Sequence, residues 1–371
     1  MQKITFDHSN KSGFYKIVAN KIDNYFTENN ITKKGNCKYV FKVMFFLLLT
    51  VVSYTAIITS HRNDWTLAIL FILFGLFNTI LVFTVAHDAA HHAVSEKKWV
   101  NQILEHVWDT AGISSYFWKL KHNHSHHGFT NVPGKDGDID QSSLILLNPY
   151  ASRKWFHRYQ HIYAPFLYAL LSLNIIYIKD FRLLLVHEFG NKTISRHPQK
   201  EIILLLAGKL FFISYMIVIP KFLLDLTWMQ IIGYHLLMNL AIGLFVGLIL
   251  VPVHVTEAAT FRVPDDKGLI HCNWGEHQME ATIDFSANNY LVNFITGGLN
   301  THVAHHLFPA INHIHYYQIT KIIRQTANEL QVPYRNYSWF RVFINHLKFL
   351  KTLGNFHLIE VETTFEKVLV N

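Results

Sequence analysis

The sequence predicts an all-α integral membrane protein, in which four transmembrane helices form two hairpins under a cytosolic helical cap. Three observations support this fold class. Half of the 371 residues are hydrophobic, only 16% are charged, and 25 are histidines. A soluble domain carries about 25% charged residues. This composition excludes a disordered or fibrous chain, and it is not typical of an ordinary soluble one.

The four predicted spans are apolar stretches of the length that a bilayer requires, about 20 residues. They are residues 43–60, 65–86, 202–220 and 226–253. Short links join the first to the second and the third to the fourth, so each pair is expected to form a hairpin. The third span contains Lys209, whose ammonium group is expected to extend toward the nearer interface.

We interpret the chain as one domain of 371 residues in five consecutive parts. These are a cytosolic segment (1–42), a hairpin (43–86), a cytosolic region (87–201), a second hairpin (202–253) and a cytosolic region (254–371). Outside the two hairpins lie 30 of the 33 basic residues, which by the positive-inside rule places these regions in the cytosol. The net charge of +8 therefore indicates orientation, and no nucleic-acid partner is expected.

The first residues are polar and show no cleavable signal peptide. Two cysteines, Cys37 and Cys272, are too few for a disulfide framework, which fits a reducing compartment. We expect an inner membrane if the source is a bacterium and the endoplasmic reticulum if it is a eukaryote. Near the end of the chain, residues 315–350 have the pattern of an amphipathic helix broken near Pro333.

The histidines are concentrated in three groups, with His254 alone after the fourth span. The groups are His87, His91 and His92; His122, His124, His126 and His127; and His302, His305 and His306. Residues three or four apart share a helix face, so His87 is expected to point with His91, and His122 with His126. Imidazole suits iron, zinc and copper, and one site for two metal ions would use eight or nine such ligands.

The members of such a site must meet on one side of the membrane. A fifth apolar stretch, residues 159–178, is therefore expected to lie in the interface instead of crossing. We expect His92 and His124 to lie off the shared faces, and His235 is the one histidine inside a span. Four carboxylates are candidates to orient imidazole N–H groups: Asp88, Asp136, Asp138 and Asp140.

Through its three histidine motifs, the sequence resembles the membrane fatty acid desaturase family over most of its length. The motifs are HDAAH at 87–91, WKLKHNHSHH at 118–127 with TN at 130–131 and DGDID at 136–140, and GGLNTHVAHHLFP at 297–309. Their order most resembles the acyl-CoA and acyl-lipid group that includes front-end desaturases. His302 and Ala304 stand where that group often has Gln and an acidic residue, so the resemblance leaves regioselectivity open.

The resemblance implies a non-haem centre of two iron ions (Fe²⁺) that uses O₂ to desaturate the acyl chain of an acyl-CoA or a lipid. The implied ligands are His87, His91, His122, His126, His127, His254, His302, His305 and His306. Asn300 in the third motif joins the aspartates as a candidate to support them. The sequence has no H-P-G-G motif of a fused cytochrome b5 domain, so a separate cytochrome b5 or ferredoxin and its reductase are expected to supply electrons.

Other interpretations stay open at the level of sequence. A hydroxylase or related oxidase would use the same scaffold. A histidine-rich metal transporter would place its ligands within the spans, where only His235 lies. Trp118 and Trp274 are candidate walls of an acyl tunnel. The basic residues of 97–121 and 153–158 are candidates to bind a CoA or phospholipid phosphate or an acidic electron donor, or they only mark orientation.

Overall fold

The computed structural model describes residues 3–7, 13–61, 65–140 and 142–355. Four long helical segments have the length and apolar composition needed to cross a membrane, as predicted. The first is α2 (Cys37–Ile58), and the fourth is α13 (Trp228–Leu250). The second and third segments each contain a π turn between two α-helices. The second consists of α3 (Trp65–Val82), η1 (Phe83–His87) and α4 (Asp88–Ala90). The third consists of α11 (Gln199–Ile213), η5 (Ser214–Val218) and α12 (Ile219–Leu223).

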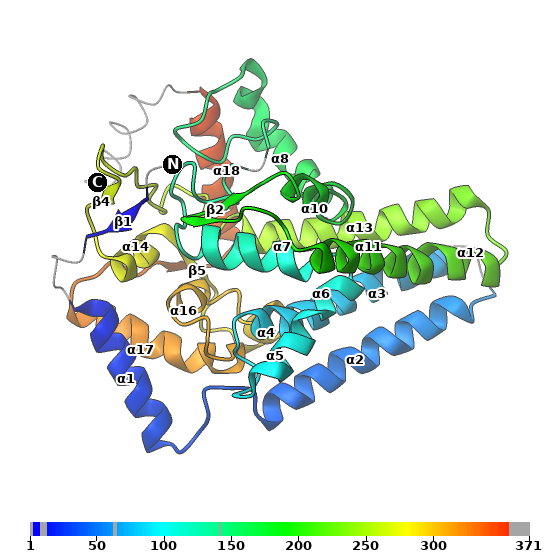
Figure 1. The fold of residues 1–371 in the computed structure, drawn as a ribbon, viewed down its shortest axis with the longest axis horizontal. Helices are drawn as coiled ribbons and strands as arrows, with labels where there is room; N and C mark the ends of the chain where they lie inside the picture. Colours follow the sequence, from blue (N-terminus) through cyan, green and yellow to red (C-terminus); the bar gives the residue numbers. More distant parts are fainter. Residues whose placement is uncertain (1–2, 8–12, 62–64, 141, 356–371) are drawn as a thin grey trace.

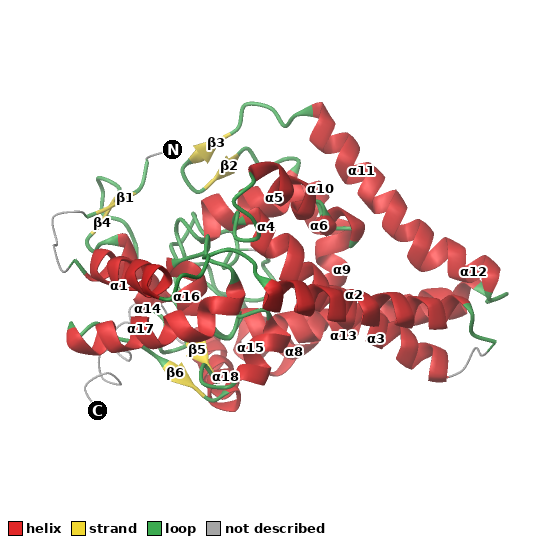
Figure 2. Ribbon diagram, turned by 90° about the horizontal axis from the view of Figure 1, so that it is seen from below, coloured by secondary structure: helices red, strands yellow, loops and turns green. Residues whose placement is uncertain are grey.

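The long segments project together from one end of the molecule (Figure 1). Helix α3 packs against both α2 and α13, whereas α11 runs along the outside of the bundle (Figure 2). Many outward side chains are exposed and apolar, such as Leu48, Phe222 and Met229. Apolar exposure on this scale fits contact with lipid. The pairing into two membrane hairpins and the side of the membrane on which the cap lies stay predictions.

The first span begins earlier than the sequence predicted. The side chain of Asn36 accepts hydrogen bonds from the backbone N–H groups of Lys38 and Tyr39, and so caps α2 at its N-terminus. Helix α2 therefore starts at Cys37 rather than at residue 43, and Lys42 lies within it. This shift matters for the site described below, because Lys42 is only 1% exposed.

The fifth apolar stretch forms a bent pair of helical segments. Its first arm is η3 (Trp155–Tyr159) with α8 (Gln160–Ala169), and its second arm is α9 (Leu171–Asn174), η4 (Ile175–Lys179) and α10 (Asp180–Leu183). The arms meet at 63°, and Pro165 lies inside α8. Two glycines of α13, Gly243 and Gly247, allow the bent pair to pack closely against this helix. A Cβ on Gly243 would lie 2.2 Å from the carbonyl oxygen of Ala169. A bent pair of this kind is either a broken span or a re-entrant loop, so the placement of this stretch in the interface stays a prediction.

The remaining helices gather at the opposite end as a cap (Figure 1). Phe14, Val18 and Tyr316 belong to their buried core. The broken amphipathic helix predicted at 315–350 is confirmed as α17 and α18. The cap helices are α1 (Phe14–Glu28), α5 (Lys98–Glu105), α6 (Val107–Thr110), α7 (Ser115–Lys119), η2 (Leu120–His126), α14 (Trp274–Ala281), α15 (Tyr290–Thr296), α16 (His302–Leu307), η6 (His313–His315), α17 (Tyr316–Glu329) and α18 (Trp339–Asn355).

The described residues include three two-residue strand pairs, so the fold is mostly rather than entirely helical. Two of them join segments that are far apart in the sequence: β1 (Thr5–Phe6) is parallel to β4 (Leu269–Ile270), and β5 (Asp284–Phe285) is parallel to β6 (Asn336–Tyr337). The third is a local hairpin, in which β2 (Glu188–Phe189) is antiparallel to β3 (Lys192–Thr193).

The prediction that Lys209 extends to the interface is wrong. Its side chain is buried, with Nζ 2.6 Å from Oδ2 of Asp180 and 2.6 Å from the carbonyl oxygen of Gly112. The bent pair supplies this carboxylate close to α11, so the ammonium group is neutralised inside the protein and does not need to reach water. The ion pair therefore holds α11 to the bent pair.

Replacing Lys209 with Met is expected to lower the free energy of unfolding by roughly 3–5 kcal/mol, because it leaves the Asp180 carboxylate buried without its cation. Unfolding of the purified protein in micelles measures this change. The double variant Lys209→Met/Asp180→Leu should recover most of the lost stability, since it removes both charges. A single variant as stable as the wild type would contradict the role of this pair.

Candidate metal centre

The nine predicted histidine ligands converge where the cap meets the second and fourth long segments. Their candidate ligand atoms form two groups, in each of which all atoms lie within 4.8 Å of one another. The first is His87, His91, His122 and His305, and the second is His126, His254, His302 and His306. His127 joins the first group, because its Nε2 lies 2.9 Å from Nε2 of His305 and 3.1 Å from Nε2 of His122.

The helix that carries the second histidine motif is a π helix, η2. The backbone N–H of His127 donates to the carbonyl of His122, five residues back, which widens the turn. As a result His122 lies with His127, while His126 belongs to the other group. The rings of His122 and His126 nevertheless stack with their centroids 5.6 Å apart, so the prediction that they point together is confirmed, although their ligand atoms belong to different groups. The prediction for His87 and His91 is confirmed, because both lie in the first group.

The third histidine motif also divides between the groups. On α16, His302 and His306 are four residues apart and belong to the second group, whereas His305 belongs to the first. A single helical turn thus contributes to both groups. The ring centroids of His305 and His306 are 5.4 Å apart, so the two groups are direct neighbours.

Most imidazoles of this cluster favour the neutral form. Burial, followed by the neighbouring histidines, holds the pKa values of six of them well below the usual range: His91, His122, His127, His302, His305 and His306. For the same reasons the pKa of His254 falls to about 3. A neutral imidazole keeps a lone pair for a metal ion, so these seven rings favour the protonation state that ligation requires.

Oxygen acceptors fix which nitrogen of several rings carries the proton. Nδ1 of His254 lies 3.0 Å from the carbonyl oxygen of Ala281, and Nδ1 of His302 lies 3.1 Å from that of Leu299. A carbonyl only accepts, so these Nδ1 atoms donate and Nε2 keeps its lone pair. Among the described residues, four Nε2 atoms are buried and form no hydrogen bond: those of His87, His91, His254 and His306.

Two of the predicted carboxylates lie beside His126. Nδ1 of His126 is 3.1 Å from Oδ2 of Asp136 and 3.6 Å from Oδ2 of Asp138. Burial alone would lower the pKa of His126, but these carboxylates outweigh it and raise that pKa. Asp136 is held in place by the backbone N–H groups of Asn131 and Asp138, each at 2.9 Å. The pair therefore orients His126 with Nδ1–H directed away from the cluster.

Two further candidates from the sequence, Asp140 and Asn300, do not reach an imidazole in the described structure. Asp140 accepts hydrogen bonds from the backbone N–H of Gly134 and the amide of Asn148, both within its own loop. Asn300 bonds to neighbouring polar groups in the turn before α16, including the amide of Asn293. Both are structural: their side chains satisfy local backbone and amide groups, which places them away from the rings.

Asp88 belongs to a buried chain of polar groups that the sequence did not reveal. Its Oδ2 accepts from Nδ1 of His313 at 2.7 Å, and its Oδ1 lies 3.6 Å from Nδ1 of His87. Nζ of Lys42 lies 2.8 Å from Nε2 of His313. A carboxylate only accepts, so His313 donates from Nδ1 to Asp88, and its Nε2 is bonded to Lys42. The chain from Lys42 thus fixes the carboxylate that lies beside His87.

The structure also shows where four histidines outside the cluster lie. His92 and His124 are exposed, as expected for residues off the shared faces. His235 is bonded to the hydroxyl of Tyr177 and the amide of Asn239 instead of joining the cluster. His313, which lies outside the three histidine motifs, is buried and bonded to Asp88. Lys42, which directly precedes the first predicted span, was the sequence signal that could have indicated a buried polar partner such as His313.

The cluster fits two metal ions. Two imidazole nitrogens bound at right angles to one ion, at about 2.1 Å each, lie about 3 Å apart. The Nε2 separations of 2.9 and 3.1 Å around His127 match this spacing. Nine histidines in two adjacent groups offer nitrogen donors that suit first-row transition metals. His127, His305 and His306 also form a third close set at the boundary between the groups.

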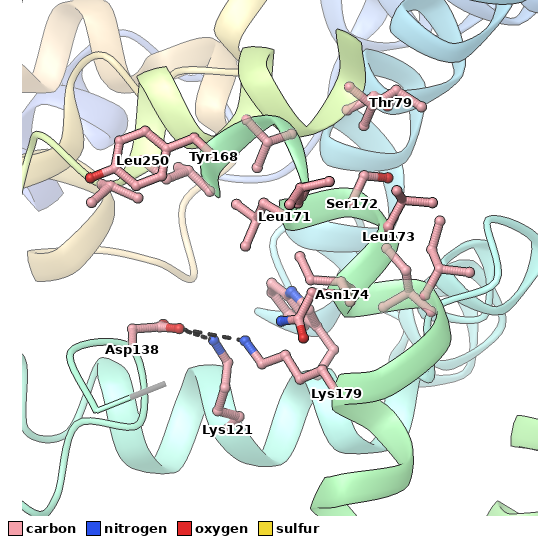
Figure 3. Close-up of a pocket in the computed structure, with 18 of the residues that line it drawn as sticks. Thr79, Lys121, Asp138, Tyr168, Leu171, Ser172, Leu173, Asn174, Lys179 and Leu250 are labelled. Carbon is pink, nitrogen blue, oxygen red and sulfur yellow. Dashed lines mark hydrogen bonds and ion pairs between the residues drawn. The ribbon is translucent and has the colours of Figure 1, made fainter. Parts of the chain in front are cut away.

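An apolar cavity of about 580 Å³ opens from this cluster. Its wall near the metal site includes His87, His126 and His302, and it extends between α3, α13 and the bent pair to Phe74 and Met238. Figure 3 shows the bent pair, with Leu171 and Leu173, along one side. The size falls within the range for small-molecule sites. A cavity of this shape and polarity accepts an extended hydrocarbon chain beside the histidines.

Of the two predicted tunnel walls, only one lines the cavity. Trp118 is in its wall, between the first and second histidine motifs. Trp274 instead packs its ring against Tyr15 and donates a hydrogen bond from Nε1 to the carbonyl oxygen of His127 at 3.3 Å. It therefore supports the backbone of a candidate ligand and does not line the cavity.

Comparison with known proteins agrees with this site. The fatty acid desaturase family matches residues 63–338. The chain is 30% identical to the sn-1 linoleoyl-lipid 6-desaturase of Arthrospira platensis, over 91% of this chain and 94% of that protein. It is 28% identical to the protein of the same name from Synechocystis (93% and 96%) and to the acyl-lipid (8-3)-desaturase of Physcomitrium patens (95% and 74%).

The chain belongs to the fatty acid desaturase family. It is an oxidoreductase that desaturates fatty acyl chains, as the resemblance in the sequence implied. The matched region covers the second, third and fourth long segments and all three histidine motifs.

Replacing Lys42 with Met is expected to lower the free energy of unfolding of the metal-free protein by about 1–3 kcal/mol, since it leaves Nε2 of His313 buried without its hydrogen-bond partner. Denaturant unfolding in micelles measures the loss. Lys38→Met, an exposed lysine of the same helix, is the matched control and should leave stability unchanged. Equal stability of the two variants would show that the buried chain does not stabilise the site.

Proposed function

We propose that this chain introduces a double bond into the acyl chain of a membrane lipid, at a centre of two iron ions held by the nine histidines. The observation that carries this proposal is the opening of the histidine cluster into a 580 Å³ apolar cavity. Relatives across nearly the whole chain are named as acyl-lipid or lipid desaturases, which supports a lipid substrate over an acyl-CoA.

We assign the first iron to His87, His91, His122, His127 and His305, and the second to His126, His254, His302 and His306. Bound iron, with O₂ and two electrons, would supply the oxidising power that removal of hydrogen from an unactivated methylene requires, which side-chain acids and bases lack. A separate cytochrome b5 or ferredoxin and its reductase are the proposed source of the electrons.

The residues of the chain orient the substrate and keep the site dry. Val82, Leu250 and Leu299 belong to the apolar wall that holds the acyl chain next to the histidines. Such a wall excludes water, which protects reactive intermediates from side reactions. Hydrogen bonds from the rings to Asp136, Ala281 and Leu299 hold the imidazoles in one orientation, so the ligand nitrogens are arranged before metal binds.

We propose that the four long segments cross the membrane and that the cap, with both chain ends, faces the cytosol. The distribution of basic residues supports this orientation. It places the cluster near the cytosolic boundary of the bilayer, where a lipid substrate can reach the cavity and a soluble or membrane-anchored electron donor can reach the cap.

One histidine from each group tests the assignment. His126→Ala and His305→Ala are each expected to lower bound iron and to abolish new unsaturated acyl products, because each removes a ligand nitrogen. Iron is measured per purified chain, and lipids are measured after expression in a host with a simple lipid profile. His124→Ala is the matched control, because His124 is exposed beside the same motif.

In this experiment the control should keep full iron content and activity. Full activity without His126 or His305 would overturn the proposed centre. Mass spectrometry of the same lipids maps the double bonds. A hydroxylated chain in place of an unsaturated one would assign the related hydroxylase reaction instead.

A further inference from the structure

A buried glutamine lies between the two histidine groups. Gln278 of α14 is fully buried, and its carboxamide contacts one residue of each group. Its Oε1 lies 2.9 Å from Nδ1 of His306, which belongs to the second group. Its Nε2 donates a hydrogen bond at 3.2 Å to the backbone carbonyl oxygen of His127, which joins the first group. This one side chain therefore connects the two halves of the candidate metal centre.

The hydrogen bonds determine how this carboxamide is oriented. A backbone carbonyl only accepts, so the amide nitrogen must face His127 and the amide oxygen must face His306. The hydroxyl of Thr130 lies 3.0 Å from Oε1 and 2.7 Å from the carbonyl oxygen of His126, and it can donate to either. Rotating the amide by half a turn would place two oxygens against each other at His127. The oxygen beside His306 is therefore fixed as an acceptor.

This acceptor determines which nitrogen of His306 is available to a metal ion. An amide oxygen cannot donate, so Nδ1 of His306 carries the proton and Nε2 keeps its lone pair. Nε2 of His306 is buried and, among the described residues, forms no hydrogen bond. The other three rings of the second group are held at Nδ1 by oxygens of Asp136, Ala281 and Leu299. Gln278 thus completes a set in which each ring of that group has an oxygen acceptor.

Helix α14 is also fastened to the end of the second histidine motif by other side chains. Nε1 of Trp274 donates to the same carbonyl oxygen of His127 at 3.3 Å, and Nε2 of His277 donates to that of Thr130 at 2.7 Å. The helix packs in addition against α16, which carries His306. Loss of the glutamine would therefore remove the acceptor of His306 while leaving α14 attached.

We propose that Gln278 is a positioning residue that holds the ring of His306 in the orientation required by the second metal ion. This inference rests on the proposed function, since it requires that the two histidine groups bind metal. Replacing a residue that holds the distal nitrogen of a metal-binding imidazole typically costs about 10–100-fold in metal affinity. Because Gln278 acts through His306, its replacement weakens the second site far more than the first.

Binding of Co²⁺ to the metal-free protein tests this role without turnover. Co²⁺ accepts imidazole ligands, and its visible absorption reports on the geometry of each bound ion. The wild-type protein is expected to bind two ions. Gln278→Met, which keeps the length of the side chain, should bind one ion as the wild type does and the other about 10–100-fold more weakly. The absorption that is lost should be the same as in His126→Ala, which removes a ligand of the second group.

Two further variants separate positioning from a general structural role. Gln278→Glu keeps an oxygen acceptor for Nδ1 of His306, so it should recover most of the lost affinity. Gln160→Met is the matched control, because Gln160 is equally buried but bonds to backbone groups of Leu146 and Leu350, neither of which is a candidate ligand. It should lower the free energy of unfolding and leave both Co²⁺ affinities unchanged.

Three outcomes would overturn the positioning role while the proposed centre stands. They are unchanged affinities in Gln278→Met, equal weakening of both ions, and no recovery in Gln278→Glu. A wild-type protein that binds fewer than two Co²⁺ ions would instead overturn the centre itself, and with it the proposed function.

Discussion

The rest of the structure depends on one constraint: nine imidazoles must lie close together inside the protein, with ring nitrogens left available to metal ions. Protonation of several rings would place like charges within a few ångströms in a buried site, at a high energetic cost. Burial and the neighbouring rings keep most of the pKa values low, for example about 3 for His254, whereas Asp136 and Asp138 raise that of His126. Carbonyl oxygens and carboxylates around the cluster then take up the remaining N–H groups. The long helices supply the buried surroundings that make this possible.

Much of this arrangement could be predicted from the sequence. Uncharged stretches of the right length indicated the four long segments, and clustered imidazoles indicated the metal site. Both signals are local, because they depend on composition and spacing within one segment. The structure brings together all nine histidines that the motifs implied, and it places Asp88, Asp136 and Asp138 beside them or their partners.

The failures arose where the structure depends on distant residues or on local helix geometry. The π turn at 120–126 brings Nε2 of His122 close to Nε2 of His127, five residues on, and the ligand atoms of His122 and His126 belong to different groups. Spacing arguments that assume 3.6 residues per turn do not anticipate this division. Lys209 and Lys42 are satisfied by Asp180 and His313, which are far away in the sequence. Asp140 and Asn300 have the right chemistry near the motifs, but their loops direct them elsewhere.

The central claim is that the cluster holds two metal ions, one in each histidine group. Anomalous X-ray diffraction at the iron absorption edge, from crystals of the iron-loaded protein, tests it most directly. The account predicts two adjacent peaks, one surrounded by His87, His91, His122, His127 and His305 and the other by His126, His254, His302 and His306. A single peak, or iron bound away from these rings, would contradict it.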